Sequence, residues 1–512
     1  LDHFYGIEID EWPARIAETA MFLIDRQCDL KLTERLGWAP DRLPIQEQAT
    51  VVVGNAIRLD WSTLVEPTDD LVIAGNPPFI GQYTKTEEQT ADAKLAWGAG
   101  YDGYLDYVTS WHAKTLGFLR GTMSVWGFVT TNSITQGQAV PALFGPIFAD
   151  GWRIKFAHTT FPWSSDAAGQ AAVHCVIIGF SKESDKRPRL FVYDSPSAPA
   201  REESPPNINA YLLDGPNLLV EKRMIPFPGL PAVVKGSQPT DGGHLQVRSS
   251  DYDEVATDVV ARKYLRRFIG ADELLSGTKR WCLWLVGLDP QDLAASQVLR
   301  DRINAVREMR LNSTKAATRS AAGTPALFTE RRQPSVPYLA IPSHVTETRR
   351  YYTVERFSAE VICGNANFTA VDPDGFLFAI ISSSMFITWQ RMIGGRIKSD
   401  LRFSNTIVWN NLPLPVPSSP DREAIISAGQ GVLAARALAP SKSLEDHYAP
   451  GRISIELAAA HEALDVLVDR AFGAKKLCAT ERERQQILFA RFEELTAPLT
   501  TSSRPAARGR QR

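Results

Sequence analysis

Short apolar runs alternate with polar and amphipathic stretches through the first 180 residues. The runs predict strands, and they cover residues 4–10, 49–56, 71–79, 123–131, 152–157 and 171–180. Apolar residues at helical spacing predict helices after residue 10 and over 101–119, and the polar segment 81–100 predicts a loop. The last two strands form a hairpin. This order predicts a doubly wound, Rossmann-like α/β sheet with an antiparallel end.

The second half has a mixed pattern. It predicts a helical stretch over 291–318, short strands at 338–342, 351–354 and 376–381, and helices after the proline-rich segment 412–417. The predicted divisions are a first domain 1–195, a linker 196–230, an α+β domain 231–411, a helical region 412–499 and a disordered basic tail 500–512.

Composition argues against a disulfide-bonded, zinc-binding or membrane-spanning protein. The net charge is −2, so any surface that binds anions must be local. The five cysteines are scattered, which argues against a zinc site or disulfides and for a reducing compartment such as the cytoplasm. We expect no metal site and no membrane segment. The chain starts at Leu1, inside strand-like sequence, and we expect it to begin within a domain.

The stretch 71–79 carries the sharpest chemical signal. Its first four residues are an apolar run typical of a strand buried on both faces, and it ends in Asn76-Pro77-Pro78-Phe79. Consecutive prolines stiffen the backbone and remove two N–H donors. The Asn76 side-chain oxygen and the Pro77 carbonyl can then hold the two N–H bonds of an exocyclic amine, while Phe79 stacks on the base. The alternative is a surface turn, because Asn-Pro is common in turns.

Three other positions suggest ligand contacts. Glu8 ends the first predicted strand, where a carboxylate typically accepts hydrogen bonds from ribose hydroxyls. Acidic residues also stabilise helix N-termini, so Glu8 and Asp10 have a purely structural alternative. Asn55 ends the second strand and is a weak candidate for contact with a cofactor base. Phe161, in a predicted loop 160–163, either packs at the rim of the sheet or stacks on an extruded base.

Four motifs in this order resemble N6-adenine DNA methyltransferases of the gamma class. They are 4–10, 76–79, 127–133 and 161–163. The segments 279–285 and 394–400 further resemble the MmeI-like group, whose members fuse endonuclease, methyltransferase and target recognition in one chain. The resemblance covers nearly the whole chain. It implies a methyltransferase domain, a DNA target-recognition domain and C-terminal helices.

The resemblance also implies roles for individual residues. Glu8, Ile9 and Asn76 would contact S-adenosyl-L-methionine, and Asn55 its adenine, although the family often has Asp at the position of Asn55. The residues expected to act on a flipped adenine in double-stranded DNA are Asn76, Pro77, Pro78 and Phe79, with Phe161 on the opposite face of the base. The family's first strand and glycine-rich loop should precede Leu1. We therefore expect a truncated sheet, and a missing N-terminal methyltransferase or endonuclease portion as a partner.

Basic residues in the second half predict contact with DNA. Arg349 and Arg350 lie beside a predicted strand, and Arg391, Arg396 and Lys398 surround Gly394-Gly395. Arginine is the commonest reader of guanine edges. The arginines of 291–318 can follow a phosphate backbone or form a solvated helix face.

Three alternative functions remain open. The first is a DNA-binding specificity module without catalysis, since the first cofactor loop is missing. The second is methylation of a protein glutamine amide, against which the large arginine-bearing second half argues. The third, a nicotinamide dehydrogenase, leaves the two prolines unexplained.

Overall fold

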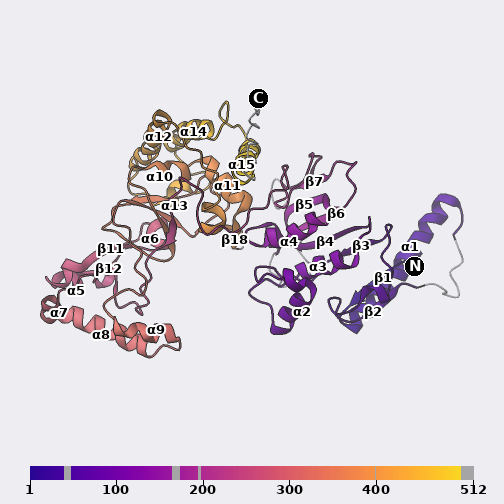
Figure 1. Ribbon diagram of the computed structural model, residues 1–512, viewed down its shortest axis with the longest axis horizontal. Coiled ribbons are helices and arrows are strands. Elements are labelled where there is room, and N and C mark those ends of the chain that lie inside the picture. Colours follow the sequence, from indigo (N-terminus) through magenta and orange to yellow (C-terminus); the bar gives the residue numbers. More distant parts are fainter. Residues whose placement is uncertain (40–47, 164–172, 194–197, 398, 498–512) are drawn as a thin grey trace, which may run out of the picture. The chain divides into compact units, whose positions relative to one another are not determined.

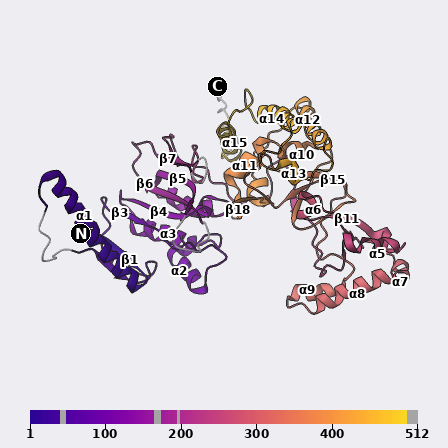
Figure 2. The same ribbon diagram turned by 180° about the vertical axis from the view of Figure 1, so that it is seen from behind.

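The computed structural model describes residues 1–39, 48–163, 173–193, 198–397 and 399–497. Two compact units divide the chain, Leu1–Leu219 and Val220–Arg512, and Figure 1 and Figure 2 show their elements from opposite sides. The predicted tail 500–512 lies outside the described residues.

The chain begins with a β–α–β segment. Strands β1 (Tyr5–Glu8) and β2 (Thr50–Val53) pair in parallel, and α1 (Glu11–Leu36) comes between them in sequence, as the pattern predicts. Among the described residues, no strand pairs with the other edge of β1. Large apolar side chains of α1 are exposed, and they include Trp12, Ile16, Leu23, Ile24 and Leu30. The segment therefore presents apolar surface and an open strand edge.

A larger sheet follows, with six strands in the described residues in the order β3-β4-β6-β5-β7-β8. Strand β4 runs parallel to β3, and β6 runs antiparallel to both β4 and β5. The predicted α/β sheet with an antiparallel end is thus confirmed. The bounds are β3 Val72–Gly75, β4 Val125–Thr131, β5 Arg153–Trp163, β6 Val173–Ser181, β7 Arg189–Val192 and β8 Arg201–Glu203. Strand β8 lies inside the predicted linker.

Helices α2 (Glu87–Trp97), α3 (Thr109–Phe118) and α4 (Ala139–Ala149) belong to the same unit (Figure 1). The core between α3 and the sheet is aromatic. Trp126 of β4 stacks on Phe180 of β6 with ring centroids 4.1 Å apart, and buried His112 of α3 packs edge-on against both. On the opposite face of β6 the neighbouring Gly179 is required, because a Cβ at that position would lie 2.1 Å from the ring of its register partner Phe156.

Three predictions for this unit are wrong. The predicted loop 81–100 contains α2, whose N-terminus has a capping box of Thr86 and Gln89. Strand β3 is not buried on both faces: it is an edge strand in the described sheet, and Val72 is 66% exposed. Residues 160–163 lie in β5 rather than in a loop, because they continue the pairing with β6.

The second unit contains three small sheets. Their strand orders are β10-β12-β11-β16, β15-β13-β17-β9 and β14-β19-β18. The strands span β9 Val233–Lys235, β10 Gln246–Arg248, β11 Leu265–Ile269, β12 Arg280–Leu283, β13 Tyr338–Pro342, β14 His344–Val345, β15 Glu355–Phe357, β16 Ile362–Cys363, β17 Asn367–Val371, β18 Gly395–Ile397 and β19 Asp400–Arg402. Strand β13 matches the predicted strand 338–342.

The second unit also contains helices. They span α5 Tyr252–Thr257, α6 Ala271–Leu275, α7 Pro290–Ala295, α8 Gln297–Leu311, α9 Ala316–Ser320, α10 Phe376–Ile381, α11 Ser384–Ile393, α12 Ser419–Ala437, α13 Leu444–Tyr448, α14 Ile455–Ala471 and α15 Glu481–Thr496. A capping box of Thr480 and Glu483 begins α15.

Two strand predictions in the second unit are wrong. Residues 376–381 form α10, every residue of which is buried, and periodicity alone does not separate a buried helix from a buried strand in so short a run. Residues 351–354 form no strand; Tyr351 and Tyr352 are buried in irregular backbone.

Candidate functional site: the loop after β3

The backbone that leaves β3 presents two unused acceptors. Asn76 is exposed, Pro77 is buried and Phe79 is half-buried. The Asn76 side chain and the Pro77 carbonyl accept no hydrogen bond from another described residue. Because β3 is parallel to β4, these acceptors lie at the carboxyl end of the parallel strands, the usual position of ligands in such sheets.

The segment before α3 holds the following part of this loop in place. The Tyr107 amide donates to the Ile80 carbonyl at 2.9 Å, and the Gln82 amide donates to Asp106 Oδ1 at 2.7 Å. Lys85 Nζ donates to the Leu105 carbonyl at 2.6 Å. Three hydrogen bonds thus fix residues 80–85, immediately after the proline pair.

Phe161 reaches the same end of the sheet. In register it pairs with Cys175 of β6, which in turn pairs with Thr131 at the carboxyl end of β4. Its ring lies 5.4 Å from that of Tyr193, whose hydroxyl is 2.8 Å from His158 Nδ1. The half-buried Phe161 therefore belongs to an aromatic cluster at the rim, and it keeps an accessible part.

Glu8 ends β1 with one carboxylate oxygen in use. Oε1 accepts from the amides of Ile9 at 2.8 Å and Asp10 at 3.2 Å. Oε2 has no partner among the described residues. Ile9 beside it is 64% exposed. A free carboxylate oxygen next to an exposed apolar side chain suits a ribose hydroxyl and a flat base.

Asn55 uses both of its side-chain groups inside the protein. Its Nδ2 donates to Asp92 Oδ2 at 2.9 Å, and its Oδ1 accepts from the Ile57 amide at 2.9 Å. Arg58 and Tyr107 also donate to Asp92. This geometry favours a structural role for the Asn55 side chain, which orders the turn after β2.

The residues around Asp92 stabilise its ionised carboxylate. Burial disfavours the charge on Asp92, but hydrogen bonds from Arg58, Asn55 and Tyr107 outweigh it and lower the pKa of the carboxyl group. Burial, together with the neighbouring carboxylate, raises the pKa of Tyr107 to about 12. Asp92 thus stays ionised and ties the turn after β2 to the segment before α3.

In the second unit, three of the predicted DNA-binding arginines meet around Glu347. Arg396 Nη1 donates to Glu347 Oε2 at 3.0 Å, and Arg391 Nη2 donates to the Arg349 carbonyl at 2.8 Å. Arg391 also pairs with Glu481 of α15 at 2.9 Å. Arg349 is buried, and its Nη1 donates to Thr353. Arg391 of α11 therefore joins the segment 347–349 to α15, Arg349 orders the segment 346–353, and Arg396 lies on the β18–β19 hairpin.

The remaining predicted DNA-binding residues are Arg350 and Lys398. Arg350 is exposed, lies 3.5 Å from Glu462 and has its guanidinium over the ring of Tyr351. Lys398 lies outside the described residues. Among the helical arginines, Arg310 departs from both earlier interpretations: it is fully buried and donates to five backbone carbonyls.

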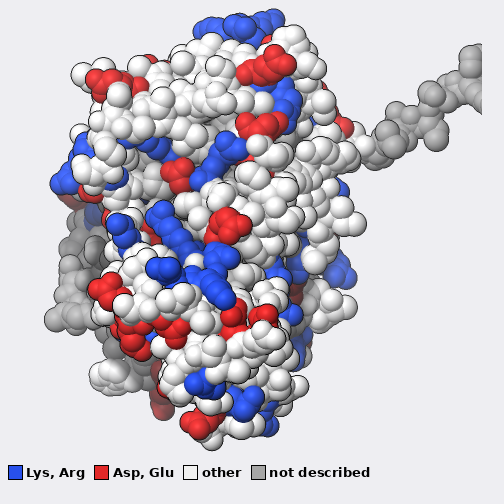
Figure 3. Space-filling view, turned by 90° about the vertical axis from the view of Figure 1, so that its left-hand side faces the viewer, with Lys and Arg blue, Asp and Glu red and all other residues white. Residues whose placement is uncertain are grey.

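Sequence reasoning missed a set of exposed cations around β10, β11 and β12. They are Arg248, Arg262, Arg267 and Lys279. Figure 3 views the side of the molecule that carries these strands and α5, and Lys and Arg gather near its middle among Asp and Glu. They come from separate parts of the chain: Arg248 pairs in register with Arg280, which follows Lys279, and Arg267 pairs with Trp281. Local sequence therefore gave no signal for them as a group.

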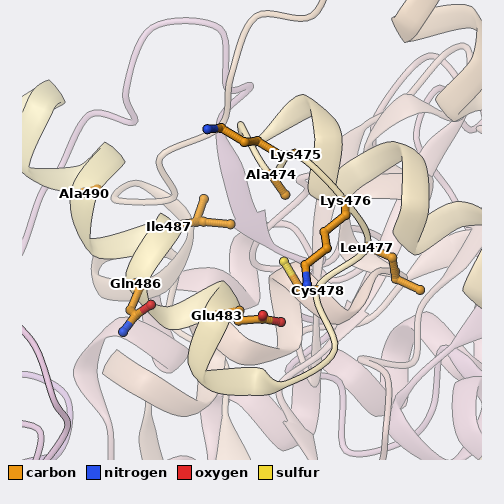
Figure 4. A pocket seen from close by; sticks show the side chains of 9 residues that line it. All are labelled: Ala474, Lys475, Lys476, Leu477, Cys478, Glu483, Gln486, Ile487 and Ala490. Atoms are coloured by element: carbon orange, nitrogen blue, oxygen red, sulfur yellow. The ribbon is translucent and has the colours of Figure 1, made fainter.

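A shallow groove of about 390 Å³ lies between residues 474–478 and α15 (Figure 4). Apolar side chains such as Leu477 and Ile487 line much of it, and it contains none of the predicted site residues. The described residues hold no cluster of three or more potential metal ligands. Among them, no helix has both the length and the apolarity needed to span a bilayer.

Comparison with known proteins assigns each part of the chain. Residues 1–192 match the DNA-methyltransferase domain of MmeI, residues 214–416 its target recognition domain, and residues 418–500 its C-terminal domain. The chain therefore has a DNA-methyltransferase domain, a target recognition domain and a C-terminal domain of the MmeI type, in this order.

Two relatives align with almost the whole chain. DNA methyltransferase A of Bacillus subtilis (strain 168) is 30% identical over 505 residues, which are 97% of this chain and 56% of that protein. The Type IIL restriction-modification enzyme MmeI, solved in complex with DNA, is 36% identical with a TM-score of 0.84 over 97% of this chain and 67% of that chain. The chain therefore belongs to the MmeI family. It spans about half the length of the B. subtilis protein.

Proposed function

We propose that this protein transfers a methyl group from S-adenosyl-L-methionine to the N6 amine of an adenine flipped out of a specific site in duplex DNA. The observation that carries the proposal is the pair of unused acceptors, Asn76 Oδ1 and the Pro77 carbonyl, at the carboxyl end of β3. Two acceptors are what the two N–H bonds of an exocyclic amine require.

The residues of the loop act on the base rather than on the methyl group. With both N–H bonds held by Asn76 and Pro77, the nitrogen lone pair is drawn out of conjugation with the ring and becomes a better nucleophile. Phe79 and Phe161 stack on the flipped base and replace the stacking lost from the duplex. As the new N–C bond forms, the methyl–sulfur bond of the donor would break and leave a neutral thioether, and the amine proton is released toward the acceptors and then to water. Most of the rate enhancement on this account is positioning.

The ribose end of the cofactor fits the residues of the β1 edge. Glu8 Oε2 is free to accept from a ribose hydroxyl, and exposed Ile9 offers apolar surface to the adenine. S-adenosyl-L-methionine, when bound, supplies an electrophilic methyl group. We assign Asn55 to ordering the turn beside that site, because both of its polar groups are already used.

The second unit is proposed to select the DNA sequence, as part of a restriction–modification protein in the bacterial cytoplasm. Two of the predicted residues have positions that suit contact with DNA. Arg350 is exposed, and Arg396 lies on the β18–β19 hairpin. The exposed cations around β11 add a surface for phosphates. Arg349 and Arg391 use their hydrogen bonds inside the protein, which favours a structural role for both.

We further propose that a polypeptide strand from outside residues 1–512 completes the cofactor site. Strands β1 and β3 each have one edge that no described strand pairs with, and both have parallel neighbours. Exposed apolar residues, among them Val72 and Ile16, flank these edges. A parallel strand added there would pair its backbone with both edges and bury this surface.

The test is transfer of a labelled methyl group to mixed duplex DNA by the protein as given and by a form extended upstream. Label on adenine N6 is expected, and Asn76→Ala should lower the rate at least about 100-fold while duplex affinity changes little. The control Asn365→Ala changes an exposed asparagine of the second unit and should leave the rate unchanged.

A second candidate function is a DNA-binding specificity module without catalysis. The open edges of β1 and β3 are the observation that favours it. If both forms bind duplex and neither labels DNA, the methyltransferase proposal is wrong and the binding module replaces it. If only the extended form labels DNA, the completing strand is required for catalysis.

A further inference from the structure

Asp106 joins three segments of the first unit that are distant in sequence. It is buried in the segment just before α3. Its Oδ1 accepts from the Gln82 amide at 2.7 Å, and its Oδ2 accepts from the Ser133 hydroxyl at 2.5 Å. One carboxylate therefore links the loop that begins at Asn76 to the turn that follows β4.

Ser133 extends this link to β4 itself. Its hydroxyl lies 2.8 Å from the Thr131 hydroxyl, and Thr131 is the last residue of the strand. Strand β4 pairs directly with β3, so the loop is held at its start by the β3–β4 pairing and six residues after Asn76 by Asp106. The polar motif 131–133, for which the proposed chemistry has no use, is thereby explained.

We propose that Asp106 is a positioning residue that fixes the loop 76–82 against the end of β4, so that Asn76 and Pro77 keep the geometry needed to hold the target amine. The inference rests on the proposed function. Asp106 touches neither base nor cofactor in this account. It acts through the Gln82 amide on one side and through Ser133 on the other.

A carboxylate suits this position for a physical reason. Pro77 and Pro78 carry no N–H, and the Asn76 and Pro77 acceptors must remain free for substrate, so the first part of the loop has few groups with which to anchor itself. Charge-assisted hydrogen bonds are about twice as strong as neutral ones, which makes one buried carboxylate an efficient anchor. A displacement of about 1 Å at such a loop can cost on the order of 100-fold in rate.

Asp92 provides a comparison within the same unit. It too is a buried carboxylate with hydrogen bonds from distant residues, but it orders the turn after β2 through Asn55 and Arg58. Tyr107, next to Asp106 in sequence, donates to Asp92. Loss of Asp92 should therefore weaken cofactor binding, whereas loss of Asp106 should slow transfer to a bound base.

The experiment compares Asp106→Ala, Asp106→Asn and Ser124→Ala in the protein form that transfers methyl groups. Ser124 is a matched control, because its buried hydroxyl donates to the Thr68 carbonyl at 2.5 Å and joins β4 to β3 at their opposite ends. We would measure kcat, the KM for cofactor and for duplex DNA, the Tm, and amide hydrogen exchange over 76–85.

Asp106→Ala should lower kcat by about 10- to 100-fold, with each KM changed by no more than about twofold. Asp106→Asn should recover most of kcat, since its Oδ1 can accept from Gln82 and its Nδ2 can donate to the Ser133 hydroxyl. Exchange at Gln82 should be faster in Asp106→Ala alone. Ser124→Ala should lower the Tm without these effects on kcat and exchange.

The outcomes separate this inference from the proposed function. If the unchanged protein transfers methyl groups and Asp106→Ala has the kcat of Ser124→Ala, the inference is wrong while the function stands. If the unchanged protein in every form transfers none, the function is wrong, and hydrogen exchange alone decides whether Asp106 anchors the loop. Unchanged exchange at Gln82 in Asp106→Ala overturns the inference in either case.

Discussion

At the scale of single residues, sequence identified chemical groups better than it identified their partners. The Asn-Pro-Pro-Phe signal depends on side-chain and backbone chemistry that is local, and the loop after β3 presents its acceptors free. Asn55 and Arg310 look equally available in sequence. Their partners, Asp92 and five backbone carbonyls, come from residues many positions away. Local pattern contains no information about such pairings.

His112 gives a prediction at this scale. Burial among the rings of Trp126, Phe128 and Phe180 lowers its pKa from 6.5 to about 4. The unfolded chain therefore takes up a proton before the folded one does, and stability is lost as pH falls through this window. The loss should be about 2 kcal/mol between roughly pH 7.5 and pH 5.

The measurement is chemical denaturation of the unchanged protein and of His112→Phe across that pH range. The variant keeps an aromatic ring in the core and removes the titration. The difference between the two proteins cancels other groups, including buried His461, whose pKa burial also lowers. Parallel stability curves for the two proteins would contradict the prediction.

At the scale of elements, periodicity found long amphipathic segments and failed on short buried ones. The helix after residue 10 and the strand 123–131 were predictable because each pattern extends over enough residues. The run 338–342 is short and fully buried, and its assignment as a strand was right although periodicity does not separate it from a buried helix. Segment 376–381 is apolar at every position, so it carries no period, and surrounding helices decide that it is α10. Strand β3 was predicted to be buried on both faces because its residues are apolar. A sequence shows apolar residues but does not show whether a neighbouring strand covers them.

The β18–β19 hairpin gives a prediction at the scale of an element. If Arg396 contacts a phosphate, Arg396→Gln should weaken duplex binding and lower the slope of log affinity against log salt by about one. The readout is duplex affinity by anisotropy over a salt series. Arg470→Gln is the control, since it removes an exposed charge from α14 and should leave the slope unchanged.

At the scale of the whole molecule, the chain is two units with separate cores. His112 belongs to the first unit, and Arg310 stabilises the second by capping carbonyls from residues 239, 240, 321, 324 and 327. Separate cores predict that unfolding is not a single two-state transition.

Calorimetry should therefore resolve two transitions. Arg310→Met removes a donor from five backbone carbonyls, and among the described residues those of Pro239, Thr240 and Leu327 have no other donor. The substitution should destabilise one transition by about 3 kcal/mol or more. Its neighbour Arg307 is exposed, so Arg307→Met should move neither transition. His112→Phe should move the other transition at low pH. A single transition that both substitutions shift would show that the two units unfold together.

The open edges of β1 and β3 also affect how the protein behaves in concentrated solution. An unpaired strand edge is a template for any other strand, including the same edge of a second molecule. Exposed Val72 and the apolar side of α1 add a solvation penalty that self-association would relieve. Aggregation should therefore begin at these edges and increase with protein concentration. A peptide strand that pairs with them should raise the solubility of the protein, whether or not it also affects methyl transfer.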